Sequence, residues 1–203
     1  AFNRDRRQIE QAMQGEALAL LERMDANPAD GYGVCLYHPE WHQGVIGILA
    51  SRIKERLHRP VTAFARGEAG EIKGSARSIT GLHIRDALDR VDRMAPGIIV
   101  KFGGHAMAAG LTLAEGTFER FSALFDDVCK AMLSEDALQQ ILETDGSLAS
   151  ADFNMALAEA LRLGGPWGQA FPEPQFSGTF RLVQQRLVGG NHLKLVLQPE
   201  GTD

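Results

Sequence analysis

The chain has 203 residues, of which 44% are hydrophobic and 23% charged, and its formal net charge is −5 at pH 7. These values are typical of a folded protein of one or two domains, and they argue against a surface covered with nucleic-acid contacts. No apolar run of about 18 residues occurs, so we expect no membrane span and no membrane partner. Two distant cysteines in apolar surroundings, Cys35 and Cys129, predict buried free thiols and a cytoplasmic location.

The first part of the chain reads as one helix over residues 1–27, followed by a break at Pro28 and Gly31. Helical and strand-like segments then alternate. The expected strands are 33–38, 60–65, 71–78, 97–102 and 109–114, and the expected helices are 44–57, 83–92 and 117–133. This alternation predicts an α/β domain over residues 31–133, with a mixed central sheet flanked by helices and preceded by a connecting helix over residues 1–30.

The composition changes after Ser134. A short helix over residues 153–163 and a proline-rich stretch predict a connector over residues 134–175. Two strand-like runs joined at "GGN" follow over residues 176–203 and predict a hairpin that is the start of an incomplete β domain. We therefore expect the sequence to be part of a longer protein.

Positive charge is concentrated between Arg52 and Arg77, where lysine and arginine outnumber glutamate. The segment indicates either a local anionic partner or an ordinary solvated helix face. The "HPEWH" motif places His38 and His42 four residues apart, but Pro39 prevents the helix that would bring both rings to one face. We expect no zinc there, and expect His42 to cap the following helix or to face a pocket.

The "GSARS" motif is more informative. On a strand, Ser75 and Arg77 share one face, and a hydroxyl beside a guanidinium suits a phosphate oxygen. Because Gly74 has no side chain, it would let a ligand approach the backbone. The alternative is an ordinary strand, because serine and arginine are common at such spacing.

The "KFGGHAMAAG" motif supports two interpretations. Gly103 and Gly104 would open a tight turn after a strand, exposing backbone N–H groups to an anion, and His105 would add a donor. The alternative is a packing motif of small residues that surrounds a core histidine. The aromatic residues Trp41, Trp167 and Phe171 likewise would either stack on bases or join the two domains.

The motif "KFGGHAMAAG" resembles the G-G-H-x-x-A-A-G signature of the DHHA1 domain, the second domain of DHH-type phosphodiesterases. "HPEWHQGVIGILASRIKERLHRPV", "GSARSITGLHIRDAL" and "NRDRRQIEQAMQGEA" resemble further stretches of the branch of that family that degrades single-stranded DNA from its 5′ end. "GPWGQAFPEPQF" resembles the entry to the OB-type domain of the same branch. The likeness extends over nearly the whole chain.

The resemblance implies a metal-dependent exodeoxyribonuclease in DNA repair and recombination. Its D-H-H motif and other ligands for two Mn²⁺ or Mg²⁺ ions would precede Ala1, so we expect no metal ligands and no catalysis in this chain. By the same resemblance, Ser75 and Arg77 would hold a 5′-terminal phosphate, and Gly103, Gly104 and His105 would contact the strand near the scissile bond. Further contacts would come from Arg52 and His42.

The implied ligand is single-stranded DNA with a 5′ end, and the implied partners are a single-stranded-DNA-binding protein and a helicase. Other functions stay open at this point. A related phosphodiesterase acting on oligoribonucleotides or cyclic dinucleotides would share the G-G-H motif but needs no OB-type continuation. A stand-alone single-strand binding module and a tRNA-binding accessory domain of a synthetase are further alternatives.

Overall fold

The computed structural model describes residues 12–16, 19, 31–168, 171–190 and 192–199. The chain divides into two compact units, Ala1–Gln140 and Ile141–Asp203. Residues 12–16 are helical, and most of the helix expected over residues 1–27 lies outside the described residues. Among the described residues, no helix has the length and apolar character needed to cross a membrane.

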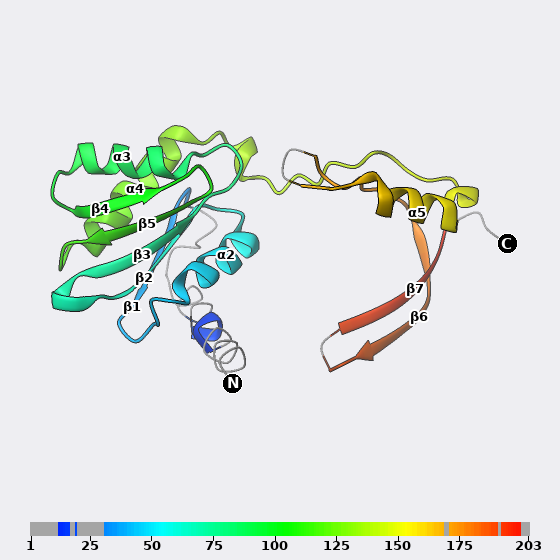
Figure 1. Cartoon of the computed structure of the whole chain (residues 1–203), viewed down its shortest axis with the longest axis horizontal. Helices are drawn as coiled ribbons and strands as arrows, with labels where there is room; N and C mark the ends of the chain where they lie inside the picture. Colours follow the sequence, from blue (N-terminus) through cyan, green and yellow to red (C-terminus); the bar gives the residue numbers. More distant parts are fainter. Residues whose placement is uncertain (1–11, 17–18, 20–30, 169–170, 191, 200–203) are drawn as a thin grey trace. The chain divides into compact units, whose positions relative to one another are not determined.

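The first unit is built on a five-stranded mixed sheet (Figure 1). Its strands are β1 (Val34–His38), β2 (Val61–Arg66), β3 (Ile72–Arg77), β4 (Ile99–Gly104) and β5 (Ala108–Leu113). The strand order is β1-β2-β3-β5-β4, in which β1 and β2 are parallel and every other pair is antiparallel. A parallel pair needs a crossover, and α2 (Ile46–Leu57) supplies it between β1 and β2.

Helices cover both faces of this sheet. The helix α2 packs on β2 and β3 from one side, whereas α3 (Ile84–Met94) and α4 (Phe118–Met132) pack together on the other side (Figure 1). Each side has its own hydrophobic cluster. The larger cluster lies under α3 and α4, where three rings, Phe64, Phe121 and Phe125, are fully buried. The mixed α/β fold expected from the sequence is confirmed.

The strand β3 shows how the sheet separates its two faces. Ile72, Gly74 and Ala76 are buried, and Ile72 and Ala76 belong to the cluster under α3 and α4. The alternate residues Lys73, Ser75 and Arg77 are only partly buried and point to the α2 side, because successive side chains of a strand point to opposite faces. One strand therefore contributes both to the core and to a polar surface.

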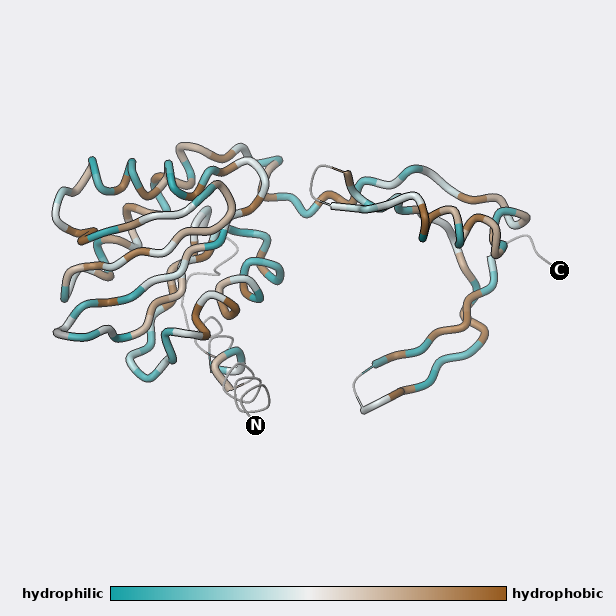
Figure 2. The backbone as a smooth tube through the Cα atoms, viewed as in Figure 1, coloured by the Kyte–Doolittle hydropathy of each residue, from teal (hydrophilic) through white to brown (hydrophobic). Residues whose placement is uncertain are grey.

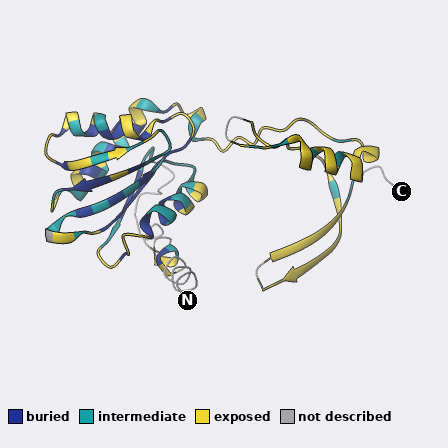
Figure 3. Ribbon diagram, viewed as in Figure 1, coloured by how far each residue is buried: buried dark blue, intermediate teal, exposed yellow. Residues whose placement is uncertain are grey.

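The second unit contains α5 (Met155–Gly164) and a two-stranded antiparallel sheet of β6 (Phe180–Val188) and β7 (His192–Pro199). Hydrophobic residues recur along both strands, and both strands are largely exposed (Figures 2 and 3). The exposed leucines of the hairpin are Leu182, Leu187, Leu193, Leu195 and Leu197. Trp167 packs on Phe171 with 4.8 Å between ring centroids, and its indole N–H donates to the carbonyl of Leu161 in α5.

The "GGHAMAAG" segment differs from the sequence-based expectation. Gly103 and Gly104 do not open a turn that leads to a helix, since both are the last residues of β4. The turn lies one residue later, and the His105 N–H donates to the carbonyl of Ala108 over 2.9 Å. The motif is thus a β-hairpin, and its alanines belong to the turn and to β5.

A partly buried contact between α4 and the two residues that precede β1 generates a stability prediction. Asp126 Oδ1 accepts hydrogen bonds from the N–H groups of Tyr32 and Gly33, over 2.7 and 2.8 Å. We expect Asp126→Ala to lower the free energy of unfolding by about 1–3 kcal/mol, because two backbone donors lose a charged acceptor. Urea unfolding measures the loss. The exposed neighbour gives the control, and Asp127→Ala matching Asp126→Ala would contradict the expectation.

Candidate nucleic-acid interface

The strand register brings polar and small residues into rows on the α2 side of the sheet. Ser75 of β3 pairs with Gly110 of β5, which in turn pairs with Gly103 of β4. The next row, two residues along each strand, consists of Lys73, Thr112 and Lys101. Rows two residues apart on a strand are separated by about 7 Å.

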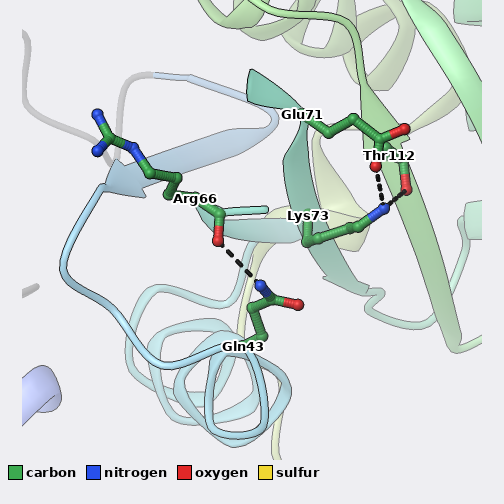
Figure 4. A network of polar contacts seen from close by, with 5 residues as sticks. All are labelled: Gln43, Arg66, Glu71, Lys73 and Thr112. Atoms are coloured by element: carbon green, nitrogen blue, oxygen red, sulfur yellow. Dashed lines mark hydrogen bonds and ion pairs between the residues drawn. The ribbon is translucent and has the colours of Figure 1, made fainter. Parts of the chain in front are cut away.

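A cleft of about 470 Å³ lies over these two rows. Its floor comes from β3, β5 and β4, and its wall comes from the residues at the beginning of α2. The wall residues are Gln43, Gly44, Ile46 and Gly47. Gln43 is held in place because its side-chain amide donates to the carbonyl of Arg66 over 3.0 Å (Figure 4).

Arg77 does not itself line the cleft; it lies in a third row, hydrogen-bonded to the lining residue Ser75. It pairs with Ala108, whose carbonyl accepts from the His105 N–H. The guanidinium donates from Nε to Ser51 Oγ over 3.2 Å, and from Nη1 to Ser75 Oγ over 3.0 Å and to the Ala76 carbonyl over 2.8 Å. These contacts fix the guanidinium between α2 and β3.

The charge of Arg77 is not balanced by a carboxylate. Among the described residues, Arg77 forms no ion pair, and its Nη2 has no hydrogen-bond partner. Burial lowers the pKa of this guanidinium from its usual value, which shows that the charged form has lost part of its hydration. An immobilised, partly dehydrated guanidinium with free N–H donors is suited to an anion such as phosphate.

Gly47 permits the close approach of α2 to this arginine. A Cβ at Gly47 would lie 2.8 Å from Arg77 Nη2 and 3.1 Å from Ser75 Oγ. Any side chain there would displace the guanidinium or the helix. The sequence-based analysis did not identify Gly47, because the contact joins residues that are far apart in the chain.

The glycines of β4 and β5 fall into two groups. At Gly103 and Gly110 an added Cβ would meet no heavy atom within 4 Å, so neither glycine is required by packing. Gly104 is different, since its Cβ would lie 2.4 Å from the Ala108 carbonyl oxygen. Gly103 and Gly110 face each other across β4 and β5, and together they leave a bare stretch of main chain in the cleft floor.

Gly74 has a structural role that the sequence did not indicate. We expected it to admit a ligand to the backbone. In the fold, its missing side chain is replaced by core atoms, because a Cβ would lie 2.4 Å from Phe64 Cε1 and 2.7 Å from Leu111 Cδ2. Gly74 is therefore required by core packing, and it also lines the cleft, so its expected contact with a ligand stays a prediction.

The other expected contact residues lie at different distances from the cleft. His105 is exposed at the hairpin turn, adjacent to Gly104. His42 is exposed before α2; its Nδ1 accepts from the Gly44 N–H over 3.0 Å, and its carbonyl accepts from the Val45 N–H. Arg52 is exposed on α2, 3.6 Å from Glu55. None of these three side chains lines the cleft.

The sequence-based analysis missed Lys73, Thr112 and Lys101. Lys73 and Lys101 both line the cleft, and Lys73 Nζ donates to Thr112 Oγ1 over 3.2 Å (Figure 4). The signal for Lys73 was available, because it alternates with Ser75 and Arg77 on one strand. Lys101 and Thr112 join this face only through the strand pairing, which the sequence does not state.

The cleft is poorly suited to a divalent cation. Its charged side chains are cations, and its other residues are mostly glycines and hydroxyl-bearing residues, whereas Mn²⁺ and Mg²⁺ prefer carboxylate oxygens. Among the described residues, no group of three or more His, Cys, Asp or Glu side chains has an arrangement that could hold a metal ion.

Two further residue types take structural places. Cys35 and Cys129 are free and buried, and burial raises the pKa of both thiols, which therefore stay protonated. Trp41 does not present its ring for stacking on a base, because only 4% of it is exposed and its indole N–H donates to Glu16 over 3.0 Å. Trp41 instead joins residues 12–16 to the α2 side.

Two family models match the chain. Residues 30–131 match the DHHA1 domain, and residues 144–203 match the RecJ OB domain. The chain therefore belongs to the DHHA1 domain family, as its G-G-H motif indicated. The first match coincides with the mixed sheet and its cleft, and the second with the unit that contains β6 and β7.

Similar proteins bear one name. The chain is 55% identical over 202 residues to the single-stranded-DNA-specific exonuclease RecJ of Dickeya dadantii and 55% identical over 205 residues to that of Escherichia coli. Each alignment covers 99% of this chain but only 35% of the relative. The crystal structure of Thermus thermophilus RecJ in complex with Mn²⁺ matches 97% of this chain and 28% of its own, with a TM-score of 0.72 and 30% identity.

Gly104 and Gly110 allow a glycine that is sterically required to be compared with one that packing does not require. We expect Gly104→Ala to lower the free energy of unfolding by about 2 kcal/mol or more, because the new Cβ overlaps the backbone of β5. Gly110→Ala is expected to raise it by about 0.5–1 kcal/mol, since alanine loses less entropy in a strand interior. Urea unfolding of both variants tests the distinction. Equal stabilities would show that Gly104 is not sterically required.

Proposed function

We propose that this chain is the nucleic-acid-binding part of a single-stranded-DNA-specific 5′→3′ exonuclease that acts in DNA repair and recombination. The chain spans about a third of the length of the curated relatives, which are named single-stranded-DNA-specific exonucleases. In this proposal the cleft binds the strand and another part of the enzyme hydrolyses it. The chain alone is then expected to bind DNA without cleaving it.

The observation that carries the proposal is the guanidinium of Arg77. It is fixed by Ser51, Ser75 and the Ala76 carbonyl, and it has no carboxylate partner among the described residues. A terminal phosphate adds a second negative charge and further acceptor oxygens relative to an internal diester. Such a group would engage the free Nη2 donors and the Ser75 hydroxyl together.

The remaining residues follow from the same geometry. Gly103 leaves the main chain of β4 open, so a sugar–phosphate backbone would lie close to it. Gly104 supports this surface by holding β4 against β5, and His105 at the turn would donate a hydrogen bond to a phosphate. Arg52 and His42, which lie outside the cleft, would contact the strand further along.

The metal requirement is proposed for the rest of the enzyme. The Thermus thermophilus RecJ described above was crystallised in complex with Mn²⁺. The cationic cleft of this chain does not suit a divalent ion, so no hydrolytic step is assigned to its residues. We assign a Mn²⁺- or Mg²⁺-dependent centre to the part that this chain does not include.

The main alternative is a related phosphodiesterase that acts on oligoribonucleotides or cyclic dinucleotides. It would share the DHHA1 domain, but the match of residues 144–203 to the RecJ OB domain favours the exonuclease. The single-stranded-DNA-binding protein, the helicase and the cytoplasmic location stay predictions of the sequence.

Recognition of a 5′ phosphate can be measured directly. We expect the chain to bind a 5′-phosphorylated 12-nucleotide strand more tightly than its 5′-hydroxyl counterpart, and Arg77→Ala to remove this difference. The affinity for the phosphorylated strand is expected to fall about tenfold or more, because a charge-assisted hydrogen bond contributes about 1.5–3 kcal/mol. Fluorescence anisotropy with a 3′-terminal label measures both affinities.

Arg93→Ala provides the matched control for this measurement. Arg93 is exposed on α3, on the opposite side of the sheet, and pairs with Asp89 over 2.7 Å. Its replacement removes the same charge from the protein without touching the cleft. Equal binding of the two strands by the unmodified chain would contradict the assignment of Arg77 and Ser75.

The open main chain at Gly103 makes a second, steric prediction. We expect Gly103→Val to weaken binding of both strands at least tenfold, because its side chain would project into the cleft. Its free energy of unfolding is expected to change by less than about 0.5 kcal/mol, since the added atoms meet open space and valine favours strands. Anisotropy and urea unfolding measure the two effects. Unchanged binding would show that the strand does not cross Gly103.

A further inference from the structure

The row of Lys73, Thr112 and Lys101 is not used by the terminal-phosphate site. It lies in the same cleft, on the side of Ser75 and Gly103 away from Arg77, because β3 runs from Lys73 through Ser75 to Arg77. Lys73 is about 7 Å from Ser75 along the strand and about 13 Å from Arg77. Because the second distance is twice the first, a strand that spans Arg77 and Lys73 would place phosphates that are not adjacent at the two positions.

The two lysines differ in what surrounds them. Among the described residues, the Lys101 side chain is exposed and has no hydrogen-bond or ion-pair partner. Lys73 Nζ forms an ion pair with Glu71 Oε2 and a hydrogen bond with Thr112 Oγ1, as Figure 4 shows. Glu71 itself does not line the cleft, but its carboxylate reaches Lys73, which does.

Glu71 interacts with both lysines. The hydrogen bond from Lys73 lowers the pKa of the Glu71 carboxyl, and the nearby charges of Lys73 and Lys101 lower it further. Glu71 is therefore ionised at neutral pH and forms an ion pair with the ammonium group of Lys73, which lines the cleft. This carboxylate is a weak ligand, because the ion pair is only partly buried and solvent still screens it.

We propose that Lys73, Lys101 and Thr112 form a second phosphate-binding position in the cleft, and that the Glu71 carboxylate occupies Lys73 until an internal phosphate of a single strand displaces it. The inference rests on the proposed function, since it assigns the ligand to the same cleft. Thr112 remains a hydroxyl partner for the incoming phosphate or for Lys73. Lys101 supplies the charge that Glu71 does not neutralise.

This arrangement links binding to strand length. A mononucleotide with one phosphate occupies only the position at Arg77 and leaves the Glu71–Lys73 ion pair intact. A longer strand reaches both positions and exchanges the carboxylate for a phosphate. Discrimination against mononucleotides, which are the products of an exonuclease, follows from the exchange.

The test uses the whole chain and a 3′-fluorescein-labelled 12-nucleotide oligothymidylate with a 5′-hydroxyl end. We expect Lys101→Ala to weaken its binding several-fold and to reduce the salt slope by about 0.7, the value for one phosphate contact on a single strand. Lys130→Ala, an exposed lysine of α4 on the other side of the sheet, is the matched control. Equal effects of the two substitutions would overturn the proposal.

The role of Glu71 is tested by a double-mutant cycle. Glu71→Gln is expected to strengthen binding of the same strand about two- to fivefold, the range of a solvent-screened ion pair. Like Glu71, Glu115 does not line the cleft, but among the described residues it forms no ion pair with Lys73 or Lys101. Glu115→Gln removes an equal charge and is expected to have no such effect. In a Lys73→Met background the gain from Glu71→Gln is expected to disappear. A gain that persists there would show simple repulsion of DNA by Glu71, and would overturn the exchange.

The two proposals fail separately. The 5′-hydroxyl strand lacks the terminal phosphate, so its response to Lys101 and Glu71 substitutions does not depend on Arg77 recognising an end. Loss of the preference for a 5′ phosphate, with these responses intact, would overturn only the terminal-phosphate assignment. Thymidine 5′-monophosphate as competitor completes the design, since Lys101→Ala is expected to leave its inhibition constant unchanged. An equal loss for the mononucleotide and the 12-nucleotide strand would overturn the second position.

Discussion

The pairing of β5 with β3 on one side and with β4 on the other determines the geometry of the whole cleft. Both pairings are antiparallel, and β4 pairs regularly with β5 from Lys101 to Gly104, after a register shift between Ile99 and Lys101. Residues from three separate parts of the sequence therefore form rows. One row is bare main chain at Gly110 and Gly103, and the rows on either side are cationic. A slip of one residue in either pairing would turn one strand's contribution toward α3 and α4. The chemistry of the surface thus depends on backbone hydrogen bonds in the sheet.

The opposite face of the same sheet makes this precision possible. The large cluster under α3 and α4 contains Ala76, Leu111 and Phe64. Their burial there holds the strands in place. The part of the α2 face formed by β3, β5 and β4 can then carry residues that contribute little to stability. Arg77 illustrates the balance, because within the described part of the chain its partly dehydrated charge is held by neutral acceptors and by no carboxylate. An anionic ligand would supply what the fold omits.

The sequence predicted local features well and long-range ones poorly. Strand periodicity placed Ser75 and Arg77 on one face, and their hydrogen bond of 3.0 Å shows them together. The "GGHAMAAG" segment was predicted as a turn after a strand, whereas it contains the end of β4, a turn and the beginning of β5. Its small residues lack the alternation of apolar and polar side chains that indicates a strand. The roles of Gly74 and Gly47 depend on Phe64 and Arg77, contacts that no local pattern contains. The position of Lys101 on this face follows only from the pairing of β4 with β5.

Gly103 and Gly110 make the depth of the cleft adjustable independently of the fold. Neither position is surrounded by atoms that a side chain would disturb, and both lie on the floor. Larger residues at these two sites would fill the cleft in graded steps, while the sheet beneath keeps its register. The filled protein would then accept only a ligand that carries a matching notch. The pair therefore offers a bump-and-hole system, by which the binding of one chosen strand can be separated from that of all others.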